Sequence, residues 1–375
     1  QKACSYWAGF FLSIPAHNPQ QQSSFLAFAN GYRSETVIMG AAMEYTKING
    51  ARVSRIALGT WAIGGQEWGA MDASESIATC RSIFDHGINC IDTAFIYGQG
   101  HAEEIIGRAI QEHGQREDFY IATKGGLVLQ NGNCVADGRP EQILREIDDS
   151  LRRLGVDYID LYQLHWPDAL TPIARTANAM REAFEAGKIR ALGVSNCSSQ
   201  QMEEFRAVAP LHTSQPPLNI FERAAQESVL PYCRKHDICV LAWSPLCRSL
   251  LTGKIRADQT FAANDIRSQD PKFSQDPKFQ PPRLAQYVAA VQALDRYAQQ
   301  QYGKRVLHLA LRWLLDQPGV SVALWGAKRP DQLASVEEVF GWKLTGQDMQ
   351  AIDKIVQESV IDPVGPEYLT PGLRQ

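Results

Sequence analysis

The sequence lacks features that several classes of protein require. It has no long run of basic residues and a formal net charge of -4, so we expect neither nucleic acid nor an anionic membrane as a partner. Its eight cysteines are scattered, with no Cys-x-x-Cys pair and no metal-ligand spacing, which argues against a metal site and favours reduced thiols in the cytoplasm. The apolar run over residues 6–15 is too short to span a bilayer.

Residues 1–42 differ from the rest of the chain in composition. Polar linker residues follow the apolar run, no basic cluster precedes it as in a secretory signal, and the sequence begins at Gln1. We interpret this segment as an upstream tail rather than a targeting signal, with Met43 as a candidate natural start. The expected organisation is a tail over residues 1–42 and a single folded domain over residues 43–375.

Segments that favour strands and segments that favour helices alternate from residue 55 onward. Eight strand-then-helix units match a closed parallel barrel better than an open sheet. An open doubly wound sheet also needs a Gly-x-Gly-x-x-Gly turn after its first strand, whereas this chain reads Gly59-Thr-Trp-Ala-Ile-Gly64-Gly65 there. Strands are expected at 56–61, 87–94, 119–124, 158–165, 189–196, 212–219, 238–244 and 321–325.

The predicted fold is therefore a (β/α)8 TIM barrel of the α/β class. Asn49-Gly50 lies between two β-prone runs and predicts an N-terminal β-hairpin, which we expect to cover the barrel bottom. Two extra helices are expected over 283–301 and 345–358, and the last residues, 363–375, read as irregular. The helices of the alternation are expected over 74–86, 101–110, 139–154, 172–186, 199–208, 224–236 and 305–315, and after Pro330.

Four ionisable side chains come from the carboxyl ends of successive expected strands. Asp92 ends the second strand and Tyr97 follows it, Lys124 ends the third and His165 ends the fourth. In a barrel these strand ends face one cup, so we expect the four side chains to meet. Each also has a purely structural explanation, such as a solvated lysine or a core histidine, but together these explanations require four coincidences.

The chemistry that these four groups suggest is proton transfer to a carbonyl oxygen. A tyrosine with a pKa of about 10 is a poor acid at neutral pH, but an adjacent ammonium stabilises the phenolate and lowers that pKa. Asp92 would hold Lys124 charged and oriented, and His165 would hydrogen-bond the carbonyl oxygen. Nothing here is a metal site, since His165 and Asp168 alone lack the ligand count.

A proton delivered to oxygen requires a hydride at carbon, so a nicotinamide cofactor is the implied partner. Ser195 and Asn196 end the fifth expected strand and Gln215 lies on the sixth, where their polar groups suit a carboxamide. Trp243, on the seventh, offers a flat face for the nicotinamide ring.

The two segments that follow the last strands suit the rest of a dinucleotide. Arg248, Gly253 and Lys254 lie in a loop suited to a pyrophosphate. Lys328 and Arg329 follow the eighth strand and open a helix, which suits an adenosine 2′-phosphate. Each signal is weak alone, and their order along one rim carries the inference.

The sequence resembles the aldo-keto reductase superfamily from about residue 44 to about residue 358. Leu250-Leu-Thr-Gly-Lys254 and Gly326-Ala-Lys-Arg329 look like its bacterial inositol-utilisation and general-stress branch. Pro216-Pro-Leu-Asn-Ile-Phe-Glu222 and Ala323-Leu-Trp-Gly326 look closer still to bacterial NADP-dependent glycerol dehydrogenases. The motifs that carry the wider resemblance are Ile91-Asp-Thr-Ala-Phe-Ile-Tyr-Gly98, Ile121-Ala-Thr-Lys-Gly125, Asp160-Leu-Tyr-Gln-Leu-His165, Gly187-Lys-Ile-Arg-Ala-Leu-Gly-Val-Ser-Asn196 and Ser244-Pro-Leu246.

The resemblance implies a barrel that binds NADP(H) along its rim. It also implies a catalytic tetrad in which Tyr97 is the general acid-base, Lys124 and Asp92 tune it, and His165 orients the carbonyl. The further residues that it implies in cofactor binding are Gly59, Thr60, Trp61, Ser244, Pro245, Leu246, Leu251, Gly326, Ala327 and Gln332.

One departure from the superfamily pattern concerns the adenosine end of the cofactor. Many members carry Glu-Asn where this chain has Ser335 and Val336, which puts the adenine contacts and the strength of NADP over NAD preference in doubt.

An aromatic cup with few charges favours small neutral aldehydes, ketones or polyols over acids. The residues expected to form this cup are Trp61, Trp68, Tyr97 and Trp166.

The leading hypothesis is an NADP(H)-dependent oxidoreductase that interconverts small aldehydes or ketones and the corresponding alcohols or polyols. Two alternatives stay open. A cofactor-binding regulatory subunit of the potassium-channel β type shares this kind of barrel and would show little turnover. A Schiff-base lyase would use Lys124 as its nucleophile, although the neighbouring Asp92 favours a charged ammonium.

Overall fold

The computed structural model describes residues 42–65, 68–69, 71–268 and 276–374. The residues described from Ala42 onward belong to one compact unit, which extends from Gly40 to Gln375. The predicted tail over residues 1–42 therefore lies, except for Ala42, outside the described residues.

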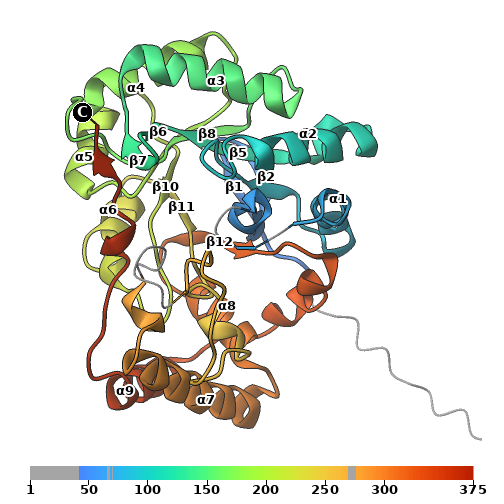
Figure 1. Cartoon of the computed structure of the whole chain (residues 1–375), viewed down its shortest axis with the longest axis vertical. Coiled ribbons are helices and arrows are strands. Elements are labelled where there is room, and N and C mark those ends of the chain that lie inside the picture. The colour runs from blue at the N-terminus through green and yellow to red at the C-terminus, as the bar shows by residue number, and fades with distance from the viewer. Residues whose placement is uncertain (1–41, 66–67, 70, 269–275, 375) are drawn as a thin grey trace, which may run out of the picture. The chain divides into compact units, whose positions relative to one another are not determined.

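Eight parallel strands form a closed barrel, which confirms the predicted fold (Figure 1). Neighbouring strands pair in the order β10-β11-β12-β3-β4-β5-β8-β9, and the last pairs with the first. Six of the eight strands are shorter than the sequence predicted, at one or both ends, whereas β5 has the predicted length and β12 is longer. Their bounds are β3 Ile56–Gly59, β4 Cys90–Asp92, β5 Tyr120–Gly125, β8 Leu161–Leu164, β9 Leu192–Ser195, β10 Thr213–Gln215, β11 Cys239–Ala242 and β12 Val320–Gly326.

Helices surround the barrel, and their buried faces form the larger hydrophobic core with the outward-facing strand residues (Figure 1). In α3, Pro140 opens the helix and Gly155 ends it in the left-handed conformation, with φ 65°. None of the helices in the described ranges is long and apolar enough to cross a membrane. The α-helices are α1 Ala73–Ser82, α2 His101–His113, α3 Pro140–Leu154, α4 Ile173–Glu185, α5 Ser199–Arg206, α6 Val229–Lys235, α7 Arg283–Tyr302, α8 Val306–Leu315 and α9 Gly346–Ser359.

The two extra helices are α7 and α9, which pack against each other. The helix predicted after Pro330 is wrong, since that segment forms two separate 3-10 turns, Pro330–Leu333 and Val336–Val339. The first turn is held by the Gln332 side chain, whose Oε1 accepts hydrogen bonds from the backbone N–H groups of Lys328 and Arg329.

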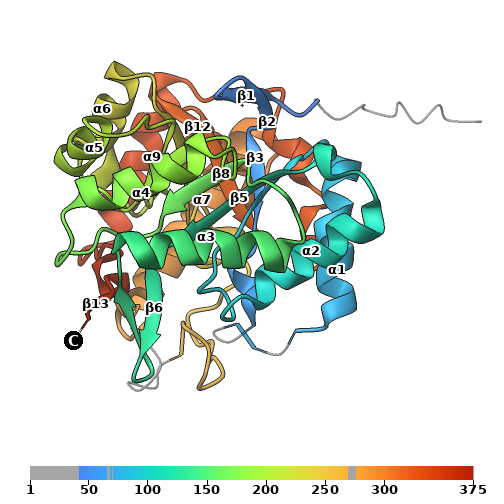
Figure 2. The same ribbon diagram turned by 90° about the horizontal axis from the view of Figure 1, so that it is seen from above.

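The N-terminal hairpin closes the bottom of the barrel, as predicted. Strands β1 Tyr45–Ile48 and β2 Ala51–Ser54 pair antiparallel across Asn49-Gly50. Ile48 and Val53 are buried in a second core, formed with the inward-facing residues of the barrel strands. Figure 2 shows this hairpin on the opposite side of the barrel from the β6 hairpin described next.

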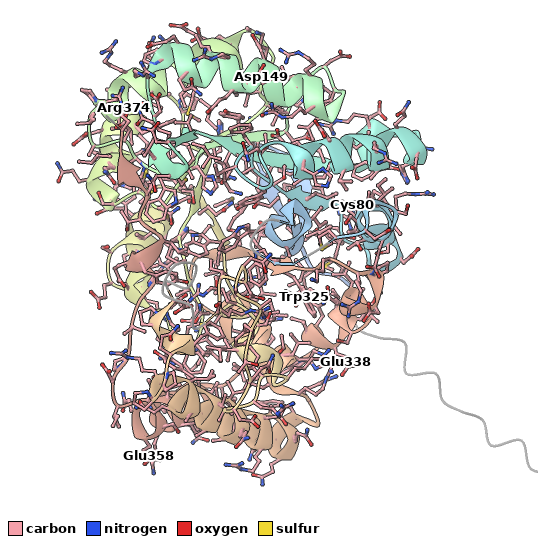
Figure 3. All side chains as sticks on the ribbon, viewed as in Figure 1. Cys80, Asp149, Trp325, Glu338, Glu358 and Arg374 are labelled. Atoms are coloured by element: carbon pink, nitrogen blue, oxygen red, sulfur yellow. The ribbon has the colours of Figure 1, made fainter. Side chains whose placement is uncertain are left out.

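The carboxyl rim carries a small sheet that the sequence prediction missed. Strands β6 Leu127–Gln130 and β7 Asn133–Ala136 form a hairpin directly after β5, and β13 Gly372–Leu373 adds to β7 in parallel. The expectation of an irregular tail is thus wrong at Gly372–Leu373. Arg374, labelled in Figure 3, follows this strand, and its Nη2 donates to Thr171 Oγ1 at 2.9 Å.

Candidate active site

A buried lysine lies at the centre of the predicted tetrad. Lys124 Nζ donates to Asp92 Oδ1 at 2.5 Å and to the carbonyl of Thr93 at 2.9 Å, and lies 3.5 Å from the Tyr97 hydroxyl. Burial acts to lower the pKa of Lys124, but the charges of Asp92 and then Tyr97 outweigh it and raise this pKa above its ordinary value. The ammonium is therefore charged and adjacent to the tyrosine oxygen.

A tight turn after β4 places Tyr97. Its backbone N–H donates to the carbonyl of Ala94 at 3.1 Å, and Gly98 follows with φ 67°. A Cβ at Gly98 would lie 2.5 Å from the carbonyl oxygen of Gly64, so only glycine lets this turn pack against the loop after β3. The turn thus presents Tyr97 over the end of the neighbouring strand β5.

His165 follows β8 and packs edge-on against Tyr97, with ring centroids 5.8 Å apart. Burial, and then the Lys124 ammonium, lowers the pKa of His165 well below its ordinary value. The imidazole is therefore neutral at physiological pH, so one ring nitrogen carries a proton that it can donate to a neutral acceptor. The four predicted catalytic side chains thus meet at one site.

Aromatic side chains line one side of this site. Trp61 stacks on Tyr97 with ring centroids 6.3 Å apart, and Trp68 meets Trp61 edge-on at 5.4 Å. Trp166 follows His165 in the chain and is half-buried. The structure brings Trp61, Trp68 and Tyr97 of the expected aromatic cup together in direct ring contact.

The residues predicted to hold a carboxamide form one hydrogen-bonded group with the tetrad. Asn196 Nδ2 donates to Ser195 Oγ and to the carbonyl of His165, both at 3.0 Å. The indole N–H of Trp243 donates to Asn196 Oδ1 at 3.1 Å. These bonds fix the plane of the Trp243 indole relative to His165.

Gln215 makes a contact that the sequence did not suggest. Its Nε2 donates to Asp92 Oδ2 at 2.8 Å and lies 3.3 Å from Gln163 Oε1. Gln163 is fully buried on β8, and its own Nε2 lies 3.4 Å from Asp92 Oδ2. Gln163 is not among the predicted site residues, although a glutamine two residues before His165 on a buried strand is a readable signal, because residues i and i+2 share a face.

The end of β3 lies beside Asp92. Gly59 pairs with Asp92 on one side and with Gly326 on the other. The backbone N–H and the hydroxyl of Thr60 both donate to the carbonyl of Asp92, at 3.0 Å and 2.9 Å. These predicted cofactor residues thus lie at the carboxyl rim, next to the tetrad.

Arg248, predicted to meet the pyrophosphate, is buried in a group of ion pairs. Its guanidinium is 1% exposed and forms ion pairs with Glu222 and with Asp276, which also contact Lys278. We name Glu222, Arg248, Asp276 and Lys278 the Arg248 cluster. Because its donors engage buried carboxylates, Arg248 anchors the loop that is predicted to meet the pyrophosphate. The carboxylate partners come from distant segments, which is why local sequence gave no sign of them.

The other predicted cofactor residues of this loop differ in how far they are exposed to solvent. Ser244 is half-buried with φ 58°, whereas Gly253 and Lys254 are exposed at the surface. The loop is thus anchored by its apolar side chains and by the Arg248 cluster, and it leaves Lys254 available to solvent. The buried predicted residues are Pro245, Leu246 and Leu251.

The segment after β12 brings two cations to the rim. Lys328 Nζ donates to the carbonyl of Trp68 at 3.1 Å, and Arg329 pairs with Asp331 at 2.9 Å. Ala327 is buried, whereas Gly326 is exposed. Farther on, Ser335 Oγ accepts from Arg305 at 3.0 Å and Val336 is fully buried.

Comparison with known proteins assigns the family. The model of the aldo/keto reductase family matches residues 55–357. The chain belongs to the aldo/keto reductase family. It is 51% identical over 335 residues to aldo-keto reductase YhdN of Bacillus subtilis, covering 89% of this chain and 99% of that protein. It is 35% identical over 298 residues to the NADH-specific methylglyoxal reductase of Escherichia coli, covering 75% of this chain and 88% of that protein.

A solved structure agrees with this assignment. The glycerol dehydrogenase AKR11B4 from Gluconobacter oxydans superposes with a TM-score of 0.77 at 47% identity, covering 88% of this chain and 99% of that one. This aldo/keto reductase is therefore an oxidoreductase of a family that acts on small carbonyl compounds and alcohols with a nicotinamide cofactor.

Proposed function

We propose that this aldo/keto reductase interconverts small neutral aldehydes or ketones and the corresponding alcohols or polyols with NADP(H), and that Tyr97 is its general acid-base. The contact of Lys124 with both Tyr97 and Asp92 carries the proposal. A charged ammonium beside the phenol oxygen stabilises the phenolate, which lets the hydroxyl release and recover a proton near neutral pH.

Each member of the tetrad has a separate task in this scheme. Tyr97 delivers the proton to the carbonyl oxygen during reduction and receives it during alcohol oxidation. Asp92 keeps Lys124 charged and aimed at Tyr97, since removing the carboxylate would leave burial to lower the lysine pKa. His165 is neutral and can donate an N–H to the carbonyl oxygen, which aligns the substrate without adding a second positive charge.

The residues of the rim fit a nicotinamide dinucleotide. When bound, this cofactor supplies or accepts the hydride at the substrate carbon. Ser195, Asn196 and Gln215 would hold the carboxamide, and Trp243 offers its indole face to the ring. The exposed Lys254 and the half-buried Lys328 would meet the phosphates, which supports NADP(H) over NAD(H).

The site also supports a substrate class. Trp61, Trp68 and Trp166 provide apolar walls, and the guanidinium over the Trp68 ring, that of Arg267 at 5.1 Å from the ring centroid, is paired with Asp265. Such a site favours a small molecule without a carboxylate or phosphate of its own.

A Schiff-base reaction at Lys124 is disfavoured, because its raised pKa keeps the amine protonated and so not nucleophilic. The cytoplasm stays the predicted compartment.

A matched spectrophotometric panel tests this proposal. Purified protein is assayed with NADPH and NADH against short aldehydes and ketones, and with NADP and NAD against glycerol-like polyols, in both cases by absorbance of the reduced nicotinamide. We expect turnover of small neutral carbonyl compounds, with a higher kcat/KM for NADPH than for NADH. Retained cofactor with negligible turnover over the whole panel would contradict the proposal and favour a regulatory subunit.

A further inference from the structure

A pair of glutamines connects the catalytic carboxylate to the predicted carboxamide site. Asp92 Oδ1 receives Lys124, while Oδ2 faces the amide nitrogens of Gln215 at 2.8 Å and Gln163 at 3.4 Å. Gln163 Oε1 in turn lies 3.3 Å from Gln215 Nε2. The carboxylate is thus shared between the ammonium on one side and two amides on the other.

The barrel wall makes room for Gln163. A Cβ on Gly193 of the neighbouring strand β9 would lie 2.9 Å from Gln163 Cγ and 2.1 Å from Thr213 Oγ1. Glycine at this position therefore leaves the space that the glutamine side chain and the threonine hydroxyl fill. Two residues before Gln163 on β8, Leu161 points into the apolar core nearer the barrel bottom. Gln163 therefore lies where the barrel interior changes from apolar to polar.

A buried glutamine is costly unless its amide is bonded. Burying an unpaired amide costs more than burying leucine, which would fill a barrel interior without that penalty. The groups that bond Gln163 are Asp92 and Gln215. We therefore infer that the glutamine serves to hold these two side chains in a fixed arrangement. The Nε2 of Gln215 is thereby directed at Asp92, which leaves its oxygen to accept from a carboxamide.

We propose that Gln163 is a positioning residue of this enzyme, which aligns Asp92 and Gln215 and so couples the acid-base group to the nicotinamide end of the cofactor. The inference rests on the proposed function. Gln163 touches neither the carbonyl nor the hydride, and it acts through the two residues it bonds.

The titratable groups around Asp92 define what a pH profile measures. Lys124 from β5 and Tyr97 from the turn after β4 lie on its Oδ1 side. The thiol of Cys90, on β4, and the imidazole of His165, after β8, also lie within electrostatic reach of Asp92 or Lys124. A new ionisable group at position 163 would add to this set.

Two substitutions at this position separate positioning from mere packing. Gln163→Met keeps the length of the side chain and removes both amide groups. We expect kcat for carbonyl reduction to fall about tenfold and the Kd of NADPH to rise about fivefold, because a hydrogen bond to a charged group is lost. The Kd of 2′,5′-ADP, a probe without nicotinamide, should stay within twofold of wild type.

Gln163→Glu supplies the readout that a packing role would not change. When protonated, this glutamate still offers a donor to Asp92 and an acceptor to Gln215, so activity at low pH should approach wild type. When ionised, it repels Asp92, so activity should fall at higher pH through an ionisation that wild type lacks. Should the methionine variant fail to fold, the glutamate variant still decides the question, because its side chain has the same shape as glutamine.

Gln317 provides the matched control. It is a buried glutamine that donates to the carbonyl of Trp313 at 3.0 Å and accepts from Gln226 at 2.6 Å, outside the barrel interior. Gln317→Met and Gln317→Glu should leave the kcat pH profile and the NADPH Kd unchanged. A Gln163→Glu profile that matches wild type would overturn the inference, as would Gln163→Met with kcat and NADPH Kd both within twofold of wild type. If wild type shows no turnover, the proposed function fails, and the NADPH and 2′,5′-ADP affinities alone then decide the role of Gln163.

Discussion

The substitution Arg248→Met tests the buried ion pairs that anchor the loop after β11. In wild type the guanidinium is 1% exposed between Glu222 and Asp276, which are 1% and 0% exposed. Methionine keeps most of the side-chain volume but removes the charge, so two carboxylates share the single cation Lys278, 2.8 Å from Glu222 and 3.6 Å from Asp276. The variant thus holds one uncompensated negative charge in a buried site.

The size of the effect follows from that geometry. Removing one partner of a buried ion pair costs about 3–5 kcal/mol, whereas an exposed pair is worth about 0–1 kcal/mol. At roughly 2 °C per kcal/mol for a large domain, we expect Arg248→Met to lower Tm by about 6–10 °C. The control is Arg256→Met, which removes an exposed pair with Asp258 whose side chains are 73% and 78% exposed, and which should shift Tm by about 1 °C or less.

The pH dependence of stability gives a second test, because the direction of the change can be predicted. Burial acts to raise the pKa of Glu222, but Arg248 and Lys278 outweigh it and hold this pKa below its ordinary value. The carboxylate therefore stabilises wild type above the unfolded-state pKa, and this stability is lost as pH falls through the folded-state pKa. Without Arg248, burial prevails and Glu222 can take up a proton, so the deficit of the variant should shrink between about pH 7.5 and pH 5.

Differential scanning calorimetry of both variants and wild type at these two pH values measures the effect. Cofactor affinity, measured by quenching of tryptophan fluorescence, gives a second readout, because the same loop carries Lys254. A Tm of Arg248→Met within about 2 °C of wild type at both pH values would refute the account of the Arg248 cluster.

Three further predictions concern separate parts of the chain. Lys328→Ala should raise the Kd of NADPH about tenfold and that of NADH less than twofold, because only NADPH carries the 2′-phosphate, and equal changes would refute the phosphate role. Burial raises the pKa of Glu146 to about 7, so wild type should lose stability as pH rises from about 6 to 8, whereas Glu146→Gln, which can still accept from Gly126 N–H, should show a flatter Tm profile. Arg374→Ala removes the contact with Asp168 at 3.2 Å and should speed amide hydrogen exchange at Gly372–Leu373 with little change in Tm; unchanged exchange would contradict this.

The barrel was readable from the sequence because its strands are short, apolar and regularly followed by helices. The helix after Pro330 was mispredicted, since hydrogen bonds from a glutamine side chain hold that segment as a 3-10 turn. The β6–β7 hairpin carries Asn131-Gly132, the same signal that predicted the N-terminal hairpin, and was nevertheless overlooked. Strand β13 has no local signal, because it exists only through pairing with a hairpin more than two hundred residues earlier in the chain.

The tetrad was predictable for a topological reason: a closed parallel barrel brings successive strand ends together. The structure places Asp92, Tyr97 and Lys124 in direct contact, with His165 against the tyrosine ring. The Arg248 cluster was not predictable, because its carboxylates come from loops distant in sequence.

The most direct test of the central claim is a single-turnover measurement on Tyr97→Phe. Enzyme preloaded with NADPH is mixed with a small aldehyde in a stopped-flow instrument, and loss of the reduced-nicotinamide absorbance is followed for wild type and variant. The account predicts that the variant binds NADPH with wild-type affinity but that its hydride-transfer rate falls by about 10²-fold or more. A rate within about threefold of wild type would show that the proton comes from another group.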